Sequence, residues 1–137
     1  MGLELCLADT SAVIRIFSQA KLYERWAPQI TAGVIAICPA VELELGRNAR
    51  SVGDFKITAR ALKDTFSWIP MTDQVWERAL EVQDSLVDMG AQGSASAIDL
   101  VIAATAERNR LTLLHCDKDF DCVARITEQR VMRVDLV

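Results

Sequence analysis

Short apolar runs typical of buried strands alternate with longer runs of helical periodicity along the whole 137-residue chain. The expected strands cover residues 3–8, 34–38, 68–70, 111–116 and 131–134. The expected helices cover residues 10–22, 23–30, 40–50, 53–66, 72–88, 95–109 and 120–126. Strands separated by helices form right-handed crossover units, which build a mostly parallel sheet covered on both faces. The alternation therefore predicts an α/β fold, and since no linker or repeat divides the chain, a single domain over residues 1–137.

Charge and cysteine content narrow the class of protein. Fifteen Lys and Arg against nineteen Asp and Glu give a net charge of −4, so any nucleic-acid contact would need a local basic patch or a bound cation. Cys6, Cys38, Cys116 and Cys122 form no C-x-x-C pair, which favours reduced thiols in a cytoplasmic protein over zinc ligands or disulfides. Apolar runs such as residues 100–106 are far shorter than the ~20 residues of a membrane span.

Carboxylates stand close behind the expected strands. Asp9 follows the first strand, Glu42 lies near the start of the helix after the second, and Asp117 follows the fourth, with Asp119 two residues further on. Asp99 lies in the first turn of a later helix. The carboxyl ends of parallel strands share one edge of a sheet, and ligands bind there. We therefore expect these acids to converge.

Each acid also has a simpler structural explanation. Asp9 is suited to cap the first helix, Asp117 or Asp119 the helix that begins at residue 120, and Ser96 with Asp99 matches a capping box. Taken together, however, several carboxylates a few ångströms apart repel one another unless one is protonated or a cation lies among them. Oxygen ligands alone select a hard ion such as Mg²⁺ or Mn²⁺, which can activate water and neutralise a phosphate. The pattern as a whole favours metal-dependent phosphate chemistry.

Four segments resemble the ordered motifs of PIN-domain nucleases: LADTSA at 7–12, VELELG at 41–46, AIDLVIAATA at 97–106 and LLHCDKDFD at 113–121. The short length and the ending at 117–137 look most like the VapC toxins of VapBC toxin–antitoxin pairs. The resemblance implies a three-layer α/β/α sandwich around a mostly parallel five-stranded sheet. It also implies a Mg²⁺- or Mn²⁺-dependent endoribonuclease that hydrolyses RNA by metal-activated water. The implied partners are a cognate VapB-like antitoxin and a second copy of the chain in a homodimer.

On the matching motifs, the resemblance implies a catalytic group of four acids: Asp9, Glu42, Asp99 and Asp117. Asp9, Asp99 and Asp117 are the expected metal ligands. Three neighbours are expected to hold these acids in place: Thr10, Ser11 and Asp119. We interpret Glu44 and Asp121 as structural or solvent-facing.

A cluster of cations lies in one stretch of this acidic chain: Arg47, Arg50, Lys56, Arg60 and Lys63. Three of them recur at helical spacing and so share one helix face. Two interpretations stay open, a solvated helix face and a phosphate track that leads RNA to the acids.

His115 is the single histidine of the chain and precedes the acidic run. Histidines at strand ends are more often structural, so we leave it out of the candidate site. Trp26, Trp68 and Trp76 are expected in the core. The stretch 23–30 is a candidate groove for an antitoxin helix.

Two other functions remain open at this point. In a non-catalytic protein-interaction module, all of the acids would be helix caps. In another Mg²⁺-dependent phosphate-handling domain, the acids would serve a different reaction. A receiver domain is disfavoured because Asp9 has no acidic neighbour, and an Asp-x-Asp phosphatase because Ser11 holds the second position.

Overall fold

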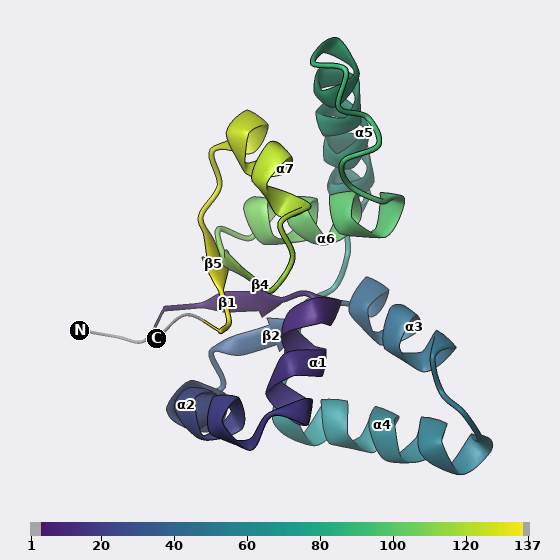
Figure 1. Cartoon of the computed structure of the whole chain (residues 1–137), viewed down its shortest axis with the longest axis vertical. Coiled ribbons are helices and arrows are strands. Elements are labelled where there is room, and N and C mark those ends of the chain that lie inside the picture. The colour runs from purple at the N-terminus through teal and green to yellow at the C-terminus, as the bar shows by residue number, and fades with distance from the viewer. Residues whose placement is uncertain (1–3, 136–137) are drawn as a thin grey trace.

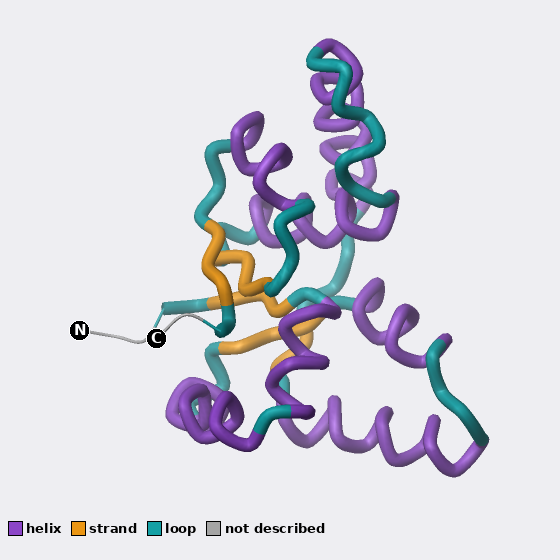
Figure 2. The backbone as a smooth tube through the Cα atoms, viewed as in Figure 1, coloured by secondary structure: helices purple, strands orange, loops and turns teal. Residues whose placement is uncertain are grey.

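The computed structural model describes residues 4–135 and contains a five-stranded, all-parallel sheet with the order β3-β2-β1-β4-β5. The strands are β1 (Cys6–Ala8), β2 (Ile35–Ile37), β3 (Ser67–Trp68), β4 (Thr112–His115) and β5 (Val131–Arg133). In Figure 2 they form the centre of the molecule, with helices on both sides. The predicted α/β/α sandwich is confirmed.

The helices divide between the two faces of the sheet. They are α1 (Thr10–Ser18), α2 (Ala20–Thr31), α3 (Pro39–Arg47), α4 (Val52–Thr65), α5 (Asp73–Asp88), α6 (Ala97–Arg108) and α7 (Phe120–Thr127). Figure 1 shows α1, α2 and α4 below the sheet and α5, α6 and α7 above it. No helix within residues 4–135 is long and apolar enough to cross a lipid bilayer.

The strand order creates a switch point between β1 and β4. The chain builds outward from β1 to β2 and β3, and then returns to the other side of β1 with β4 and β5. Beyond Ala8, the Asp9 N–H donates to the Leu114 carbonyl oxygen at 3.0 Å, which continues the β1–β4 ladder by one residue. Helices diverge to opposite faces at such a point and leave a crevice at the carboxyl ends of the strands. The strand order therefore places Asp9 at the edge where ligands bind in folds of this kind.

The central strands are buried on both faces, as expected for a parallel sheet with helices on either side. Every residue of β1, β2 and β4 is buried. Trp26 is also buried, and its indole N–H donates to the Val134 carbonyl oxygen at 2.9 Å, which ties α2 to the end of β5.

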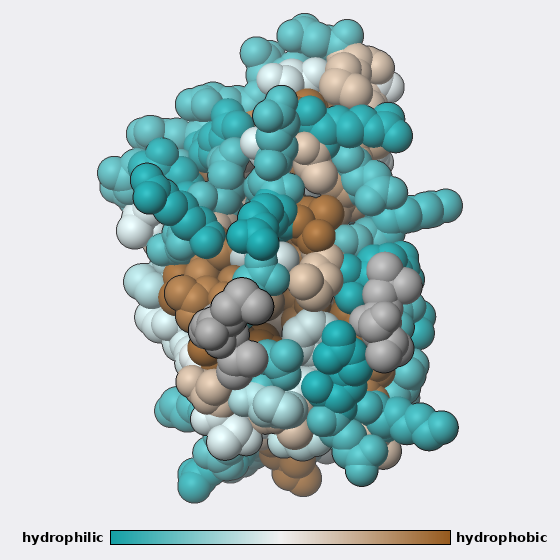
Figure 3. All heavy atoms as spheres, turned by 90° about the vertical axis from the view of Figure 1, so that its left-hand side faces the viewer, coloured by the Kyte–Doolittle hydropathy of each residue, from teal (hydrophilic) through white to brown (hydrophobic). Residues whose placement is uncertain are grey.

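The expectation that all three tryptophans lie in the core is wrong for two of them. Trp68 is 55% exposed and Trp76 is 53% exposed. Helix α5 instead buries residues at a 3–4 spacing that excludes Trp76: Val75, Ala79, Val82 and Leu86. Apolar side chains also reach the surface elsewhere, for example across the middle of the face shown in Figure 3.

Two helix boundaries differ from the sequence-based expectation. Gln19 is extended and separates α1 from α2, so the break comes earlier than residue 22. Pro28 lies inside α2 rather than ending it. A proline in the last turn removes one backbone hydrogen bond but leaves the few residues after it free to close the helix.

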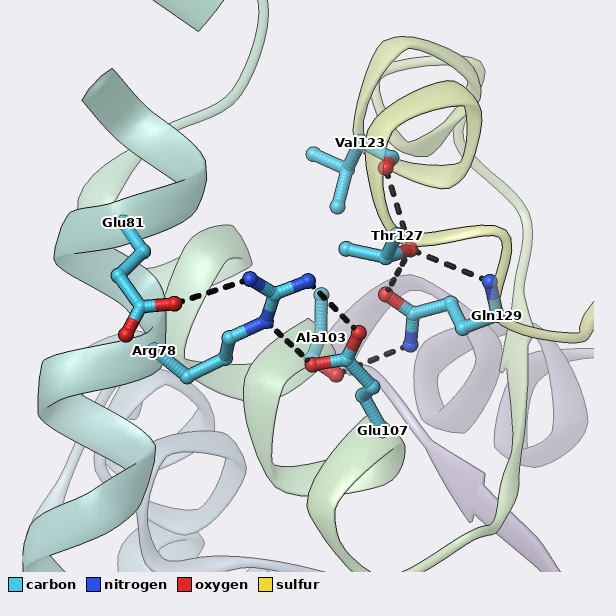
Figure 4. A network of polar contacts seen from close by, with 7 residues as sticks. All are labelled: Arg78, Glu81, Ala103, Glu107, Val123, Thr127 and Gln129. Atoms are coloured by element: carbon cyan, nitrogen blue, oxygen red, sulfur yellow. Dashed lines mark hydrogen bonds and ion pairs between the residues drawn. The ribbon is translucent and has the colours of Figure 1, made fainter. Parts of the chain in front are cut away.

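Polar contacts fix α6 against its neighbours in the upper layer (Figure 4). Arg78 of α5 donates from Nε and Nη2 to the two carboxylate oxygens of Glu107 of α6, at 2.7 and 3.0 Å. The Gln129 side chain donates to the Ala103 carbonyl oxygen of α6 at 3.0 Å. A bidentate arginine–carboxylate pair adds geometric specificity as well as energy. These contacts hold the helix that carries Asp99.

Candidate active site

Asp9 is a buried carboxylate at the end of β1. It caps α1 by accepting the Ala12 N–H at 2.9 Å, and it accepts the Ser11 hydroxyl at 2.7 Å. Only 3% of Asp9 is exposed. Burial raises the pKa of the Asp9 carboxyl to about 6, and repulsion by Asp99 and Asp117 adds to this, although both hydrogen bonds favour the charged form. Asp9 therefore caps a helix, and its charged form is disfavoured by burial and by the neighbouring acids.

Asp99 approaches the same edge from the start of α6. The predicted capping box is present, because Ser96 accepts the Asp99 N–H at 3.1 Å and Asp99 accepts the Ser96 N–H at 3.3 Å. Burial raises the pKa of the Asp99 carboxyl, and the charges of Asp117 and Glu44 raise it further. Asp99 can therefore cap α6 and belong to the acidic group at the same time.

Asp117 lies in the turn between β4 and α7. Its Oδ1 accepts the Asp119 N–H at 2.9 Å. The turn is tied to the Asp9 strand by Ser11, whose hydroxyl donates to Asp9 and accepts the Cys116 N–H at 2.9 Å. One side chain thus fixes the carboxyl ends of β1 and β4 relative to each other.

The structure separates Glu42 from these three acids and places Glu44 with them. Glu44 is half-buried, accepts a hydrogen bond from the Thr10 hydroxyl and is close enough to raise the pKa of Asp99. Glu42 is exposed and lines a hollow of about 370 Å³ with Lys56 and other residues of α4. Glu44 is therefore not simply solvent-facing, because it binds Thr10 and its charge acts on Asp99.

A signal for Glu44 is present in the sequence. Ala40, Val41 and Leu45 define the inward face of α3, and Val41 is fully buried. At 100° per residue, Glu44 falls inside the arc of these three side chains, whereas Glu42 falls outside it. The angular position on the helix therefore distinguishes Glu44 from Glu42, whereas the resemblance to the family motif did not.

The acidic group that forms at this edge consists of Asp9, Glu44, Asp99 and Asp117. Four carboxylates are a hard, oxygen-only donor set, which fits Mg²⁺ or Mn²⁺. Over residues 4–135, no three acidic, histidine or cysteine side chains already stand at ligand distance from one point. The carboxylates instead bind donors of the chain itself: Asp9 accepts the Ala12 N–H, Glu44 the Thr10 hydroxyl and Asp99 the Ser96 N–H.

The predicted supporting residues have distinct surroundings. Ser11 binds Asp9 as expected, whereas Thr10 donates to Glu44 instead. Asp119 contributes its backbone N–H to Asp117 and makes no side-chain cap of α7. Asp121 is exposed, which agrees with the solvent-facing interpretation.

The cations of the predicted RNA track lie on the surface. Arg47, Lys56, Arg60 and Lys63 are exposed on α3 and α4, and Arg50 is exposed in the intervening loop. Lys56, Arg60 and Lys63 line one hollow, so they share a helix face as the spacing predicts. An apolar groove of about 500 Å³ lies beside them between α3 and α4, away from the inward face of α3.

His115 is buried at the end of β4, with 3% exposed. Its Nδ1 accepts the Asp117 N–H at 3.2 Å, and its ring packs edge-on against Phe120 with centroids 5.4 Å apart. Burial lowers the pKa of the imidazole. The histidine that the sequence led us to set aside therefore hydrogen-bonds to the backbone of Asp117, one member of the acidic group.

The chain is similar in sequence to a known family and to named relatives. The PIN domain family model matches residues 6–126. Ribonuclease VapC21 of Mycobacterium tuberculosis is 37% identical over 125 residues, which cover 91% of this chain and 90% of the relative. Ribonuclease VapC2 of the same organism is 38% identical over 132 residues, which cover 93% and 91%.

Solved structures have the same fold at lower sequence identity. The structure of VapBC2 from Rickettsia felis bound to a promoter DNA fragment aligns with a TM-score of 0.80 at 17% identity, covering 94% of this chain and 98% of that one. The DNA-bound VapBC of Salmonella typhimurium aligns with a TM-score of 0.79 at 16% identity, covering 96% and 99%.

Proposed function

The chain belongs to the PIN-domain family, and from this premise we propose that it is an endoribonuclease, the toxin of a VapBC-type toxin–antitoxin pair. The observation that carries the proposal is the acidic group at the switch point between β1 and β4, where Asp9 is buried and the charges of Asp99 and Asp117 lie close enough to raise its pKa. A module whose acids were only caps would have no reason to bury Asp9 at the cost of a raised pKa.

The cofactor that suits these donors is a divalent cation, Mg²⁺ or Mn²⁺, held by Asp9, Asp99 and Asp117. When bound, such a cation supplies positive charge that neutralises the scissile phosphate and favours ionisation of a water molecule. Ser11 and the Ala12 N–H hold the Asp9 carboxylate in a fixed orientation. Pre-oriented ligands lower the free energy needed to assemble such a site.

We assign the fourth acidic position to Glu44 in place of Glu42. Thr10 binds Oε1 of Glu44, which leaves Oε2 free. A half-buried carboxylate with one free oxygen is suited to orient the attacking water and to accept its proton. Glu42 faces the cations of α4, where it can influence RNA binding but not proton transfer.

RNA reaches this edge along the exposed cations of α3, α4 and the loop between them. Lys56 and Lys63 supply charge to the track, whereas Arg60 is partly neutralised by Asp64 at 3.3 Å. Exposed ion pairs of this kind are weak, so a phosphate can displace Asp64.

The partner that this function requires is a VapB-like antitoxin, and the expected assembly also contains a second copy of the chain. The reduced thiols Cys6, Cys38, Cys116 and Cys122 favour action in the cytoplasm. The stretch 23–30 contributes exposed side chains such as Tyr23 to the surface that an antitoxin could cover.

The direct test is cleavage of total RNA by the purified protein with Mg²⁺, with Mn²⁺ and with chelator. We expect Asp9→Asn and Asp99→Asn each to lower the cleavage rate by at least about 100-fold. Asp121→Asn is the matched control, because Asp121 is an exposed acid close to the same site. Full activity of either site variant, or activity in chelator, would refute the proposal.

A further inference from the structure

The turn from β4 to α7 carries Asp117, and side chains bind three of its backbone N–H groups. Ser11 accepts the N–H of Cys116, and Asp117 Oδ1 accepts the N–H of Asp119. The N–H of Asp117 itself donates to Nδ1 of His115 at 3.2 Å. These bonds fix the backbone from which the Asp117 carboxylate projects.

The His115 ring is held in this orientation from outside the turn. The residue is buried, its ring packs edge-on against Phe120, and its carbonyl oxygen accepts the Val134 N–H at 2.8 Å. Because Nδ1 accepts a hydrogen bond, the proton of the neutral ring must be on Nε2. A ring packed against Phe120 presents its acceptor with little freedom to rotate.

We propose that His115 is a positioning residue of the metal site, acting through the Nδ1···H–N bond that orients Asp117. The inference rests on the function proposed above. His115 is not a ligand in this arrangement, because its acceptor nitrogen already binds the Asp117 backbone. Loss of the acceptor leaves a partly buried N–H of the turn without its partner and allows Asp117 to move away from Asp9 and Asp99.

Two amide variants separate the acceptor from the bulk of the ring. In His115→Asn the amide oxygen can occupy the place of Nδ1, whereas the longer side chain of His115→Gln places its oxygen near the position of Nε2. Val123→Ala is the matched stability control, because Val123 is buried in α7 but lies outside the turn. Each variant is compared with the unchanged protein for Mn²⁺ binding in the absence of RNA. The concentration of free Mn²⁺ is measured from its electron paramagnetic resonance signal.

We expect His115→Gln to weaken Mn²⁺ binding by about 10-fold, the usual effect of removing a group that orients a ligand. His115→Asn should stay within about 3-fold of the unchanged protein, and Val123→Ala should lose thermal stability without losing Mn²⁺ affinity. Equal effects of Asn and Gln, or no effect of either, would overturn the inference. Absence of Mn²⁺ binding by the unchanged protein would instead overturn the proposed function.

Nitrogen NMR of the unchanged protein tests the same bond without any substitution. We expect the His115 ring to be neutral, with its proton on Nε2, and a scalar coupling between Nδ1 and the Asp117 amide nitrogen. A proton on Nδ1 would contradict the inference even if both amide variants failed to fold.

Discussion

At the scale of single residues, two glutamates two positions apart in α3 have different surroundings. Glu44 accepts the Thr10 hydroxyl and faces Asp99, whereas Glu42 faces the cations of α4. Glu44→Gln keeps the acceptor for Thr10 but removes the charge, so we expect RNA cleavage to fall by roughly 100-fold. Glu42→Gln is the matched control and should stay within about 3-fold. The opposite result in the same cleavage assay would restore Glu42 as the fourth acid.

The buried charge of Asp9 makes the stability of the metal-free protein depend on pH. The pKa of Asp9 rises from 3.8 to about 6 on folding, mainly through burial, so the folded chain binds this proton more tightly than the unfolded chain. The contribution of Asp9 to stability is therefore complete below pH ~4 and is lost as the pH rises through ~6. A shift of about two units corresponds to about 3 kcal/mol at most.

Asp9→Asn removes this pH-dependent loss while keeping the oxygen that caps α1. In chelator at pH 7.5 we expect its free energy of unfolding to exceed that of the unchanged protein by about 1–3 kcal/mol. At pH 4 the two proteins should be nearly equal. Denaturant titration at both pH values measures the difference, and a less stable Asp9→Asn at pH 7.5 would show that capping outweighs the strain.

Residue types and spacing predicted which acids lie near one another, but not which glutamate of α3 joins them or what His115 binds. The acids behind β1 and β4 and at the start of α6 lie near one another, because strand ends of a parallel sheet must meet at one edge. Their role as metal ligands stays a prediction. The choice between Glu42 and Glu44 depends on the rotation of α3 about its axis, which packing of Val41 and Leu45 determines. His115 was set aside because a single histidine carries no spacing that reveals what its Nδ1 binds.

At the scale of elements, α4 presents its cations to solvent on one face. Within residues 4–135, neither Lys56 nor Lys63 forms an ion pair that would weaken its field, in contrast to Arg60 with Asp64. We expect Lys56→Gln with Lys63→Gln to weaken RNA binding and to reduce the slope of log affinity against log salt by about 1.4, at roughly 0.7 per lost contact on a single strand.

Lys21→Gln provides the control for α4, because Lys21 is an exposed cation on α2. Filter binding at several salt concentrations measures both slopes. Equal slopes for the double variant and the unchanged protein would mean that this face of α4 is only solvated.

The sequence predicted helices and strands where the hydrophobic periodicity is strong. It was less informative about which side of a helix faces the core, because packing against neighbouring helices determines that. The seven expected helical segments and five expected strands all have counterparts within residues 4–135. The expectation that Trp76 lies in the core was wrong, since Trp76 is exposed on α5 while Val82 is buried. Large apolar side chains fit two neighbouring helical phases, and only the contact with α6 selects one of them.

At the scale of the whole molecule, strand order brings the site together. The sequence predicted a parallel sheet but not the order β3-β2-β1-β4-β5, because the order depends on which side of β1 the long connection through α5 and α6 delivers β4. Placing β4 beside β1 brings the turn with Asp117 next to Asp9. A different order would leave the same acids at the same edge but too far apart for one cation.

A cation bound among these acids should stabilise the whole fold, because it binds the folded chain and finds no assembled site in the unfolded one. At 100 times its dissociation constant, Mn²⁺ would add about 2.7 kcal/mol, or roughly 6–10 °C in Tm for a chain of this size. Asp99→Asn should lose most of this shift, and a monovalent salt of equal ionic strength should not produce it. Calorimetric melting with Mn²⁺ and with chelator measures the shift. If Asp99→Asn were stabilised as strongly as the unchanged protein, the cation would be binding elsewhere, and the acids at the β1–β4 edge would be helix caps only.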